Sequence, residues 1–145
     1  MAVLIASILL AIGYAIFNII SKDLILSSSG RESLSAFYAA DSGVECALYN
    51  DYKRDAFSTS TPQVPVCRGV SVSDYSVTFD SGVYTTSFGV PFGASMTSAG
   101  VCTIVRVQRT DEAVGIKSTT VVSSGFNTCE AGNLRRTQRT LRVNY

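Results

Sequence analysis

The first 52 residues constrain this chain more than any other part. They begin with MAVLIASILLAIGYAIFNIIS, where no charged side chain precedes Lys22, and they contain no proline. An uninterrupted run of this kind predicts one long helix over Met1–Tyr52, apolar in its first half and amphipathic in its second. At about 1.5 Å per residue, such a helix is roughly 75–80 Å long. A small domain cannot cover that much apolar surface, so lipid or other copies of the chain must cover it.

The composition divides the chain into a helical segment, residues 1–55, and a β-rich remainder, residues 56–145. Residues 1–26 hold a large share of the apolar side chains, whereas the remainder is rich in Ser, Thr and Val. That remainder is large enough to bury a modest core. We therefore expect an α+β protein in which the long helix, with its hydrophobic half and its amphipathic half, packs on a small antiparallel sheet.

Charge and residue usage argue against several kinds of active site. Twelve Lys and Arg stand against 11 Asp and Glu, so the formal net charge is +1 and provides no general attraction to nucleic acid. Histidine is absent from the sequence, which excludes His-containing zinc sites and Ser–His–Asp triads. Asp41 and Glu45 lie four residues apart, but such carboxylates on an exposed helix turn usually form a solvated face. We expect no catalytic residue, no metal and no cofactor, and no nucleic-acid partner.

Four cysteines, Cys46, Cys67, Cys102 and Cys129, stand at wide spacings and form no C-x-x-C pair. Metal clusters usually show close pairs, so two disulfides formed in an oxidising compartment are the better interpretation. Three pairings are possible. We favour Cys46–Cys67, which joins the end of the helix to the β-rich part, and Cys102–Cys129, which joins a strand to a late loop. Each disulfide would add roughly 2–4 kcal/mol.

Three stretches of the predicted helix differ in pattern. Met1–Ser21 has about the length that crosses a bilayer core. Ser27–Gly30 is the softest part, and we expect the helix to bend or loosen there or near Gly13. From Arg31 onward, a stripe of large apolar residues is expected to carry the small domain, and a stripe of small residues would allow close approach of another backbone or helix. The large residues are Leu34, Phe37, Val44 and Leu48, and the small ones are Ala36, Ala39, Ala40 and Gly43.

Beyond a loop at Phe57–Pro65, the hydrophobic period becomes two, which indicates β-strands. We expect four to five antiparallel strands, one face of which covers the second half of the helix. In the last strand, Leu141 and Val143 should face the core. The predicted strands are Val70–Phe79, Val83–Phe88, Val101–Arg109, Ile116–Ser124 and Arg136–Asn144, and Gly89–Gly100 and Gly125–Asn133 are predicted loops.

Four arginines, Arg135, Arg136, Arg139 and Arg142, cluster near the C-terminus. Contact with a polyanion such as DNA is one interpretation, because Lys and Arg neutralise phosphates. A charged edge strand that discourages aggregation, or salt bridges to a neighbouring copy, is the interpretation that we favour.

The segment AFYAADSGVECALY, Ala36–Tyr49, follows an apolar helix that has no basic residue before it. Such a helix, continuing into an amphipathic half that carries a disulfide-bonded sheet, resembles type IV pilins and pseudopilins. The segment itself is similar to the A-F-x-A-A-E-A-G stretch of PilX-like minor pilins, with Asp41 where Glu is usual. Such proteins are made with a short basic leader that a prepilin peptidase removes, after which the new N-terminus is methylated. The resemblance implies that Met1 lies at or near this processed and methylated end.

The resemblance also implies a function, partners and a location. It implies a structural subunit of a type IV pilus-like extracellular filament, embedded in the inner membrane before assembly and polymerising by bundling of its N-terminal helices. The partners would be other copies of itself, the prepilin peptidase and the pilus assembly machinery, and adhesion is among the implied roles. The residues expected in the filament core helix are Ala2, Ile5, Ala6, Leu9, Leu10, Gly13, Ile16, Phe17 and Ile20.

Ile5 departs from the family pattern, because most major pilins carry an acidic fifth residue that pairs with the N-terminal amine of the neighbouring subunit. The first alternative is therefore a minor pilin or pseudopilin that primes or tips a pilus, or a secretion or DNA-uptake filament. The second alternative is a membrane-tethered ectodomain or enzyme that never polymerises.

Overall fold

A computed structural model describes residues 2–58, 61–72, 74–92, 100–111 and 117–145. The chain forms two compact units, Met1–Glu32 and Ser33–Tyr145. The first unit is helical, and the second combines the end of the same helix with the strands. The expected α+β class, with a long N-terminal apolar helix and an antiparallel sheet, is confirmed.

Helix α1 spans Ala2–Arg54. It continues through the predicted soft stretch, where Ser28 Oγ donates to the carbonyl of Ile25 at 2.9 Å. At its end, the Asp55 backbone is left-handed with a φ of 47°, and the Asp55 amide donates to the carbonyl of Asp51 at 3.2 Å. Since α1 is continuous up to that end, the expected loosening at Ser27–Gly30 or near Gly13 is not observed.

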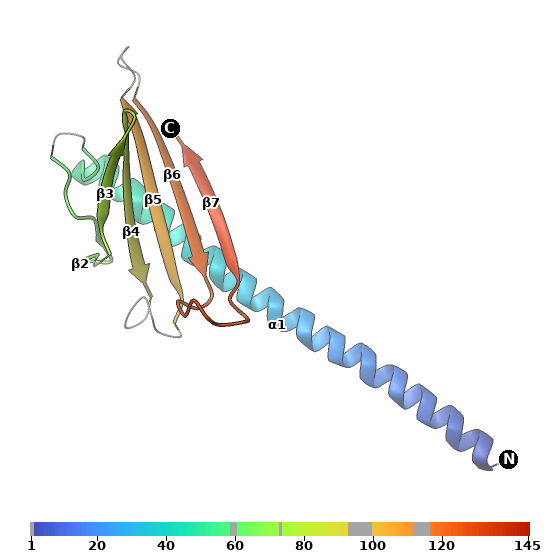
Figure 1. Cartoon of the computed structure of the whole chain (residues 1–145). Coiled ribbons are helices and arrows are strands. Elements are labelled where there is room, and N and C mark those ends of the chain that lie inside the picture. Colours follow the sequence, from blue (N-terminus) through green and yellow to red (C-terminus); the bar gives the residue numbers. More distant parts are fainter. Residues whose placement is uncertain (1, 59–60, 73, 93–99, 112–116) are drawn as a thin grey trace. The chain divides into compact units, whose positions relative to one another are not determined.

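The main sheet has five strands in the order β3-β4-β5-β6-β7, and each pair of neighbours is antiparallel (Figure 1). Because the order follows the sequence, the sheet is a meander. A separate two-stranded sheet pairs β1 with β2. The strands are β1 (Val66–Cys67), β2 (Val70–Ser71), β3 (Ser76–Asp80), β4 (Val83–Pro91), β5 (Cys102–Asp111), β6 (Lys117–Phe126) and β7 (Gln138–Asn144).

Several predicted strand boundaries were wrong. Val70–Phe79 is not one strand: Val70–Ser71 pairs with β1 in a hairpin that Arg68 and Gly69 turn with φ values of 55° and 78°, and the next strand begins at Ser76. Strand β4 continues into the predicted loop after Phe88, where pairing with β5 and burial outweigh the loop-forming tendency of Gly and Pro. Strands β6 and β7 likewise end and begin two residues later than expected.

The hairpin between β3 and β4 is confirmed, and Ser81 and Gly82 turn it with φ values of 52° and 83°. Four predicted segments of the β-rich part lie partly outside the described residues: the loop Phe57–Pro65 at residues 59 and 60, the strand Val70–Phe79 at residue 73, the loop Gly89–Gly100 at residues 93–99, and the strand that starts at Ile116 at that residue.

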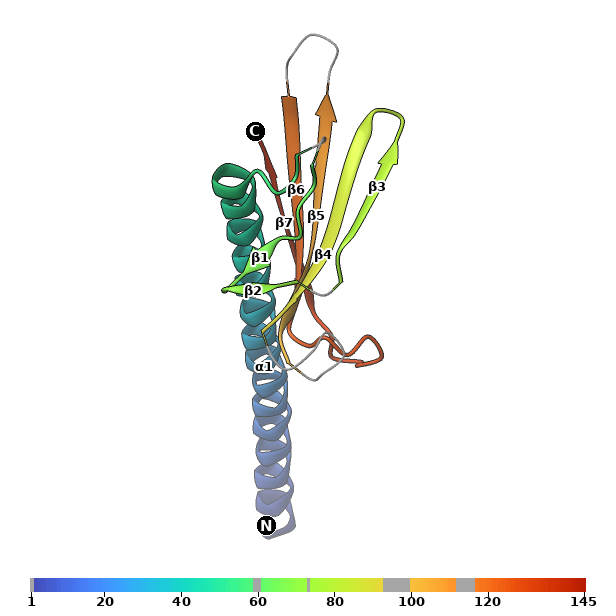
Figure 2. The same cartoon turned by 90° about the vertical axis from the view of Figure 1, so that its left-hand side faces the viewer.

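Within the Ser33–Tyr145 unit, the end of α1 runs along one face of the sheet (Figure 2). The small residues of the helix make this contact: Ala36, Ala39, Ala40, Gly43 and Ala47 are all buried. By contrast, Leu34 and Phe37 from the large stripe are exposed, and only Val44 and Leu48 join the core. The expectation that the whole large stripe would carry the domain was therefore wrong.

Gly125 of β6 explains why small residues are needed. A Cβ at Gly125 would lie 2.9 Å from the Cβ of Ala39 and would collide with the backbone of Ala36 and Ala40. At Gly43, a Cβ would lie 2.9 Å from both Oγ1 and Cγ2 of Thr103 on β5. Helix and sheet thus approach at backbone distance, which larger side chains would prevent.

The core between helix and sheet is built from Val and Phe. Phe57 stacks on Phe88 with ring centroids 6.0 Å apart, and Val105, Val107 and Val121 are fully buried beside them. Leu141 and Val143 of β7 pack against this cluster, as expected from the alternation of that strand.

Replacing Gly125 with alanine should destabilise the sheet unit by about 1–3 kcal/mol, because the new methyl group overpacks a contact that includes backbone atoms. Gly132→Ala is the matched control, since a Cβ there meets no atom within 4 Å. Urea unfolding of the detergent-solubilised full chain, followed by near-ultraviolet circular dichroism, measures both. Equal midpoints for the two variants would contradict the proposed close contact.

Candidate functional site

The helical unit Met1–Glu32 presents an apolar surface without a covering partner. Every described side chain from Val3 to Ile20 is exposed. Among the described residues, α1 is the one helix long and apolar enough to cross a membrane, as judged by length and composition. Its exposed apolar side chains are compatible with embedding in a membrane.

Polar groups within this apolar stretch are satisfied by the helix itself. Ser7 Oγ donates to the Leu4 carbonyl at 2.9 Å, Asn18 Nδ2 to that of Tyr14 at 3.2 Å, and Ser21 Oγ to that of Phe17 at 2.7 Å. A hydroxyl or amide bonded in this way can enter an apolar environment at a lower desolvation cost. The surface can therefore be covered either by lipid or by apolar side chains of another helix.

All nine residues predicted for a filament core helix lie in α1. Ile5, Leu9, Leu10, Ile16, Phe17 and Ile20 are exposed. Gly13 is also open, because a Cβ built there meets no atom within 4 Å. The side chain of Ala2, and all of Met1, lie outside what the structure describes.

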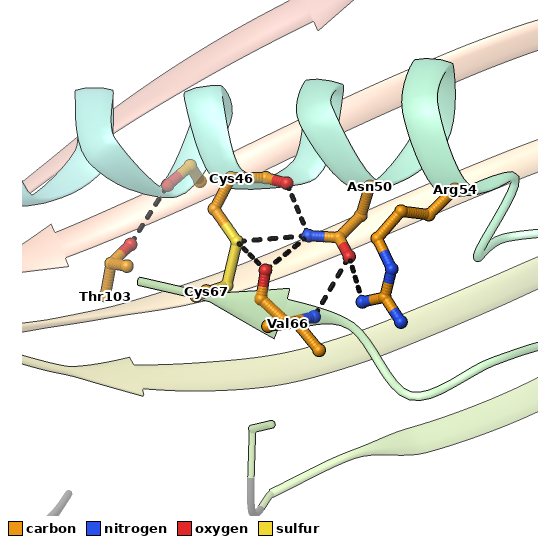
Figure 3. Close-up of a disulfide and its surroundings, with 7 residues drawn as sticks. Cys46, Asn50, Arg54, Val66, Cys67 and Thr103 are labelled. Carbon is orange, nitrogen blue, oxygen red and sulfur yellow. Dashed lines mark hydrogen bonds between the residues drawn. A yellow bond between two sulfur atoms is a disulfide. The ribbon is translucent and has the colours of Figure 1, made fainter. Parts of the chain in front are cut away.

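The Cys46–Cys67 disulfide is formed, as predicted, and joins α1 to β1 with a Cα–Cα distance of 5.6 Å. Asn50, one turn further along α1, strengthens the same junction (Figure 3). Its Oδ1 accepts from the Val66 amide at 2.9 Å, and its Nδ2 donates to the carbonyls of Val66 and Cys46 at 3.0 and 2.8 Å. A buried amide with all these bonds fixes β1 against the helix.

Beside the disulfide lies an open groove of about 740 Å³. Helix α1, the β1–β2 turn and the end of β4 contribute its walls. Apolar atoms of the disulfide and of Val66 and Val90 line it, and two aromatic rings and two opposite charges stand among its walls. Its lining includes Cys46, Cys67, Tyr49, Phe92, Glu45 and Arg68. We call this the disulfide groove.

The second favoured disulfide is not formed. Cys102 and Cys129 are both buried free thiols of one small cluster with Phe126, and they are hydrogen-bonded to each other. Burial, followed by that hydrogen bond, raises the pKa of the Cys102 thiol to about 12. The predicted Cys102–Cys129 bond was therefore wrong, although the two residues do lie in one cluster.

The four C-terminal arginines do not form one patch. Arg136 lies over the ring of Phe126, with its guanidinium carbon 3.9 Å from the centroid. Arg139 Nε donates to Ser33 Oγ of α1 at 2.8 Å, whereas Arg142 Nε donates to Asn144 Oδ1 at 3.3 Å. Because Arg139 and Arg142 are an odd number of residues apart on β7, they face opposite sides of the sheet. This distribution gives no support to a polyanion site.

A buried ionic cluster joins the end of α1 to the sheet. Arg109 Nη2 donates to Asp51 Oδ1 at 2.7 Å, and Tyr145 donates its hydroxyl hydrogen to Asp51 Oδ2, also at 2.7 Å. Arg109 Nη1 donates to the carbonyl of Phe57 at 3.0 Å, and the ring of Tyr52 stacks on Tyr145 at 5.3 Å. Both carboxylate oxygens are therefore occupied, which suits a structural role better than acid–base chemistry. We call the hydrogen-bonded group of Asp51, Arg109 and Tyr145 the Asp51 clasp.

Sequence reasoning missed Asn50, Asp51, Arg109 and Tyr145. One signal was present: Arg109 shares the face of Val105 and Val107, and an arginine on a core-facing position requires a buried acidic partner. The partner itself could not be identified from the sequence, because Asp51 lies 58 residues away. Among the described residues, no group of three or more Cys, Asp or Glu side chains is placed to hold a metal ion.

The fold is an α+β arrangement of a long N-terminal apolar helix and a five-stranded antiparallel sheet, consistent with a pilin-like fold. No family model, no curated protein and no solved structure matches this chain.

Asp51→Ala should destabilise the sheet unit by about 1–3 kcal/mol, because Arg109 and Tyr145 lose their charged hydrogen-bond partner and Arg109 keeps only the exposed carboxylate of Asp55 at 3.6 Å. Asp41→Ala, an exposed acid on the same helix, should change stability by less than about 0.5 kcal/mol. Urea unfolding in detergent measures both, and a loss for Asp51→Ala no larger than that for Asp41→Ala would refute the clasp.

The clasp also predicts alkaline sensitivity. Burial, followed by the hydrogen bond to Asp51, raises the pKa of Tyr145 above its ordinary value of about 10. The folded state then holds this proton more tightly than the unfolded state, so the stabilisation is complete below about pH 10 and is lost as pH rises further. The unfolding free energy of the native chain should fall more steeply between pH 10 and 11 than that of Tyr145→Phe; parallel curves would count against the clasp.

Proposed function

We propose that this chain is a structural subunit of a type IV pilus-like extracellular filament that polymerises through its N-terminal helix. The observation that carries the proposal is the apolar surface of Val3–Ile20, which is exposed along its length and whose polar groups are satisfied within the helix. The folded Ser33–Tyr145 unit has its own core and does not need that surface. The resemblance of Ala36–Tyr49 to pilin sequences supports the same assignment.

In this proposal, the subunit resides in the membrane before assembly, with the apolar helix in lipid. A prepilin peptidase processes it at Met1, and the assembly machinery moves it into the filament. Transfer from lipid to a helix bundle exchanges one apolar environment for another, so close packing must supply the preference. Small residues such as Ala6, Ala11 and Gly13 allow that close packing.

Gly13→Leu separates assembly from membrane residence. A Cβ at this position meets no atom within 4 Å in the single chain, and leucine strengthens the helix by about 0.8 kcal/mol relative to glycine. The variant should therefore remain in the membrane fraction, whereas surface filaments should fall at least about tenfold in electron micrographs, because helices can no longer approach at this point. Gly30→Leu is the matched control: its Cβ is equally unobstructed, and it follows the membrane-length stretch.

Filaments of normal abundance from Gly13→Leu would show that close packing at this position does not hold the polymer together. Filaments that persist after deletion of residues 1–21 would refute the helix-driven assembly itself.

Ile5 favours a second candidate, a minor pilin or pseudopilin that primes or tips a filament. This side chain is exposed and apolar, and therefore cannot pair with a neighbouring N-terminal amine. Immunogold labelling distinguishes the two candidates, because a principal subunit is labelled along the shaft and a tip subunit only at the end.

A further inference from the structure

Leu134 is the most exposed of the large apolar side chains in the described part of the chain, with a relative exposure of 103%. It lies in the loop between β6 and β7, next to exposed Arg135. An isolated exposed leucine needs no explanation by itself. Leu134 differs from such a residue in two respects: hydrogen bonds hold its loop in place, and the disulfide groove has complementary chemistry.

Hydrogen bonds on both sides hold the loop around Leu134. The Arg135 amide donates to Asn133 Oδ1 at 2.9 Å, and the Arg136 amide donates to the Asn133 carbonyl at 3.0 Å. Asn127 accepts from the Thr137 amide at 2.7 Å and donates to the Arg135 carbonyl at 3.0 Å. Leu134 is thus presented on an ordered support, so little conformational entropy is lost when it enters a binding site.

The disulfide groove has the complementary chemistry. Its apolar lining can receive a leucine side chain, and Glu45 from α1 stands exposed at its wall. Among the described residues, neither Glu45 nor Arg135 belongs to an ion pair within the chain. Exposed Leu134 beside the cation Arg135 therefore complements an apolar groove beside the anion Glu45.

Arg68 determines the orientation of such a contact. Its guanidinium carbon lies 5.6 Å from the ring centroid of Phe92, on the wall contributed by the β1–β2 turn and the end of β4. Arg68 repels Arg135, whereas Glu45 attracts it. The favoured arrangement therefore places Arg135 over the α1 side of the groove and Leu134 over the disulfide.

We propose that the disulfide groove of one subunit binds the Leu134–Arg135 loop of a second copy of this chain. Within one subunit the groove is open and Leu134 is exposed, so the two surfaces are left for contact between copies. Because groove and loop are different surfaces, the contact is heterologous and extends into an open polymer when its rotation does not close. This inference rests on the proposed filament and assigns a contact between its sheet units.

Charge reversal tests the contact in the full chain, expressed in cells that assemble it. Glu45→Arg and Arg135→Glu should each lower the yield of sheared filaments about tenfold, because each places like charges together. The double variant should recover most of the native yield, since it restores an opposite pair. The matched controls are Asp41→Arg, one helical turn from Glu45, and Arg142→Glu, another exposed arginine; both should assemble normally.

A photo-cross-linking amino acid in place of Leu134 provides a second readout that does not depend on filament yield. Mass spectrometry should find its cross-links on a neighbouring copy, within residues 42–49 or 66–69. Leu134 is fully exposed, so the substitution leaves the fold intact.

The outcomes separate this inference from the proposed function. Filaments that form with cross-links elsewhere, or charge variants that assemble like the controls, overturn the groove contact while the filament assignment stands. Absence of filaments from the native chain overturns the filament assignment. Cross-linking of the membrane-embedded chain then tests the groove contact by itself, and cross-links that do not reach the groove overturn that contact as well.

Discussion

The close approach of α1 to β5 and β6 is the contact on which the Ser33–Tyr145 unit depends. Gly43 of α1 and Gly125 of β6 leave no room for a Cβ. Buried alanines before and after Gly43 on α1 complete the helix face that meets the sheet. Because small residues make this contact, the sheet can pack against the helix backbone, and the disulfide and Asn50 hold β1 on the same helix. The Asp51 clasp then joins the last turn of α1 to β5 and to Tyr145.

Because the small residues of α1 face the sheet, large apolar residues of the same helix remain exposed. Leu34, Phe37 and Tyr38 remain exposed on the Ser33–Tyr145 unit, and Val3–Ile20 are exposed on the helical unit. A soluble monomer gains nothing from either surface. A subunit that exchanges lipid for neighbouring subunits has a use for both, which is the physical basis of the proposed filament.

The helix, the α+β class and the antiparallel strands could be predicted because each depends on local pattern, whereas the order of the strands in the sheet could not. The absence of proline before residue 62 and the change of period from 3.6 to two are properties of neighbouring residues. The Cys46–Cys67 disulfide was also predictable, because it joins adjacent segments. What failed depends on packing between distant residues: which stripe of α1 meets the sheet, whether Cys102 and Cys129 oxidise, and which acid neutralises Arg109. The stripe of small residues did predict the close approach of another backbone, but it did not indicate that this backbone would belong to the chain's own sheet.

The central claim is that residues 1–21 form an assembly element and not only an anchor. Cryo-electron microscopy of filaments sheared from cells that make this chain tests it most directly. The proposal predicts a filament core in which the N-terminal helices pack on one another through Ala6 and Gly13, with the sheet units outside. Filaments whose core lacks this helix, or a chain found only as separate membrane-embedded monomers, would contradict it.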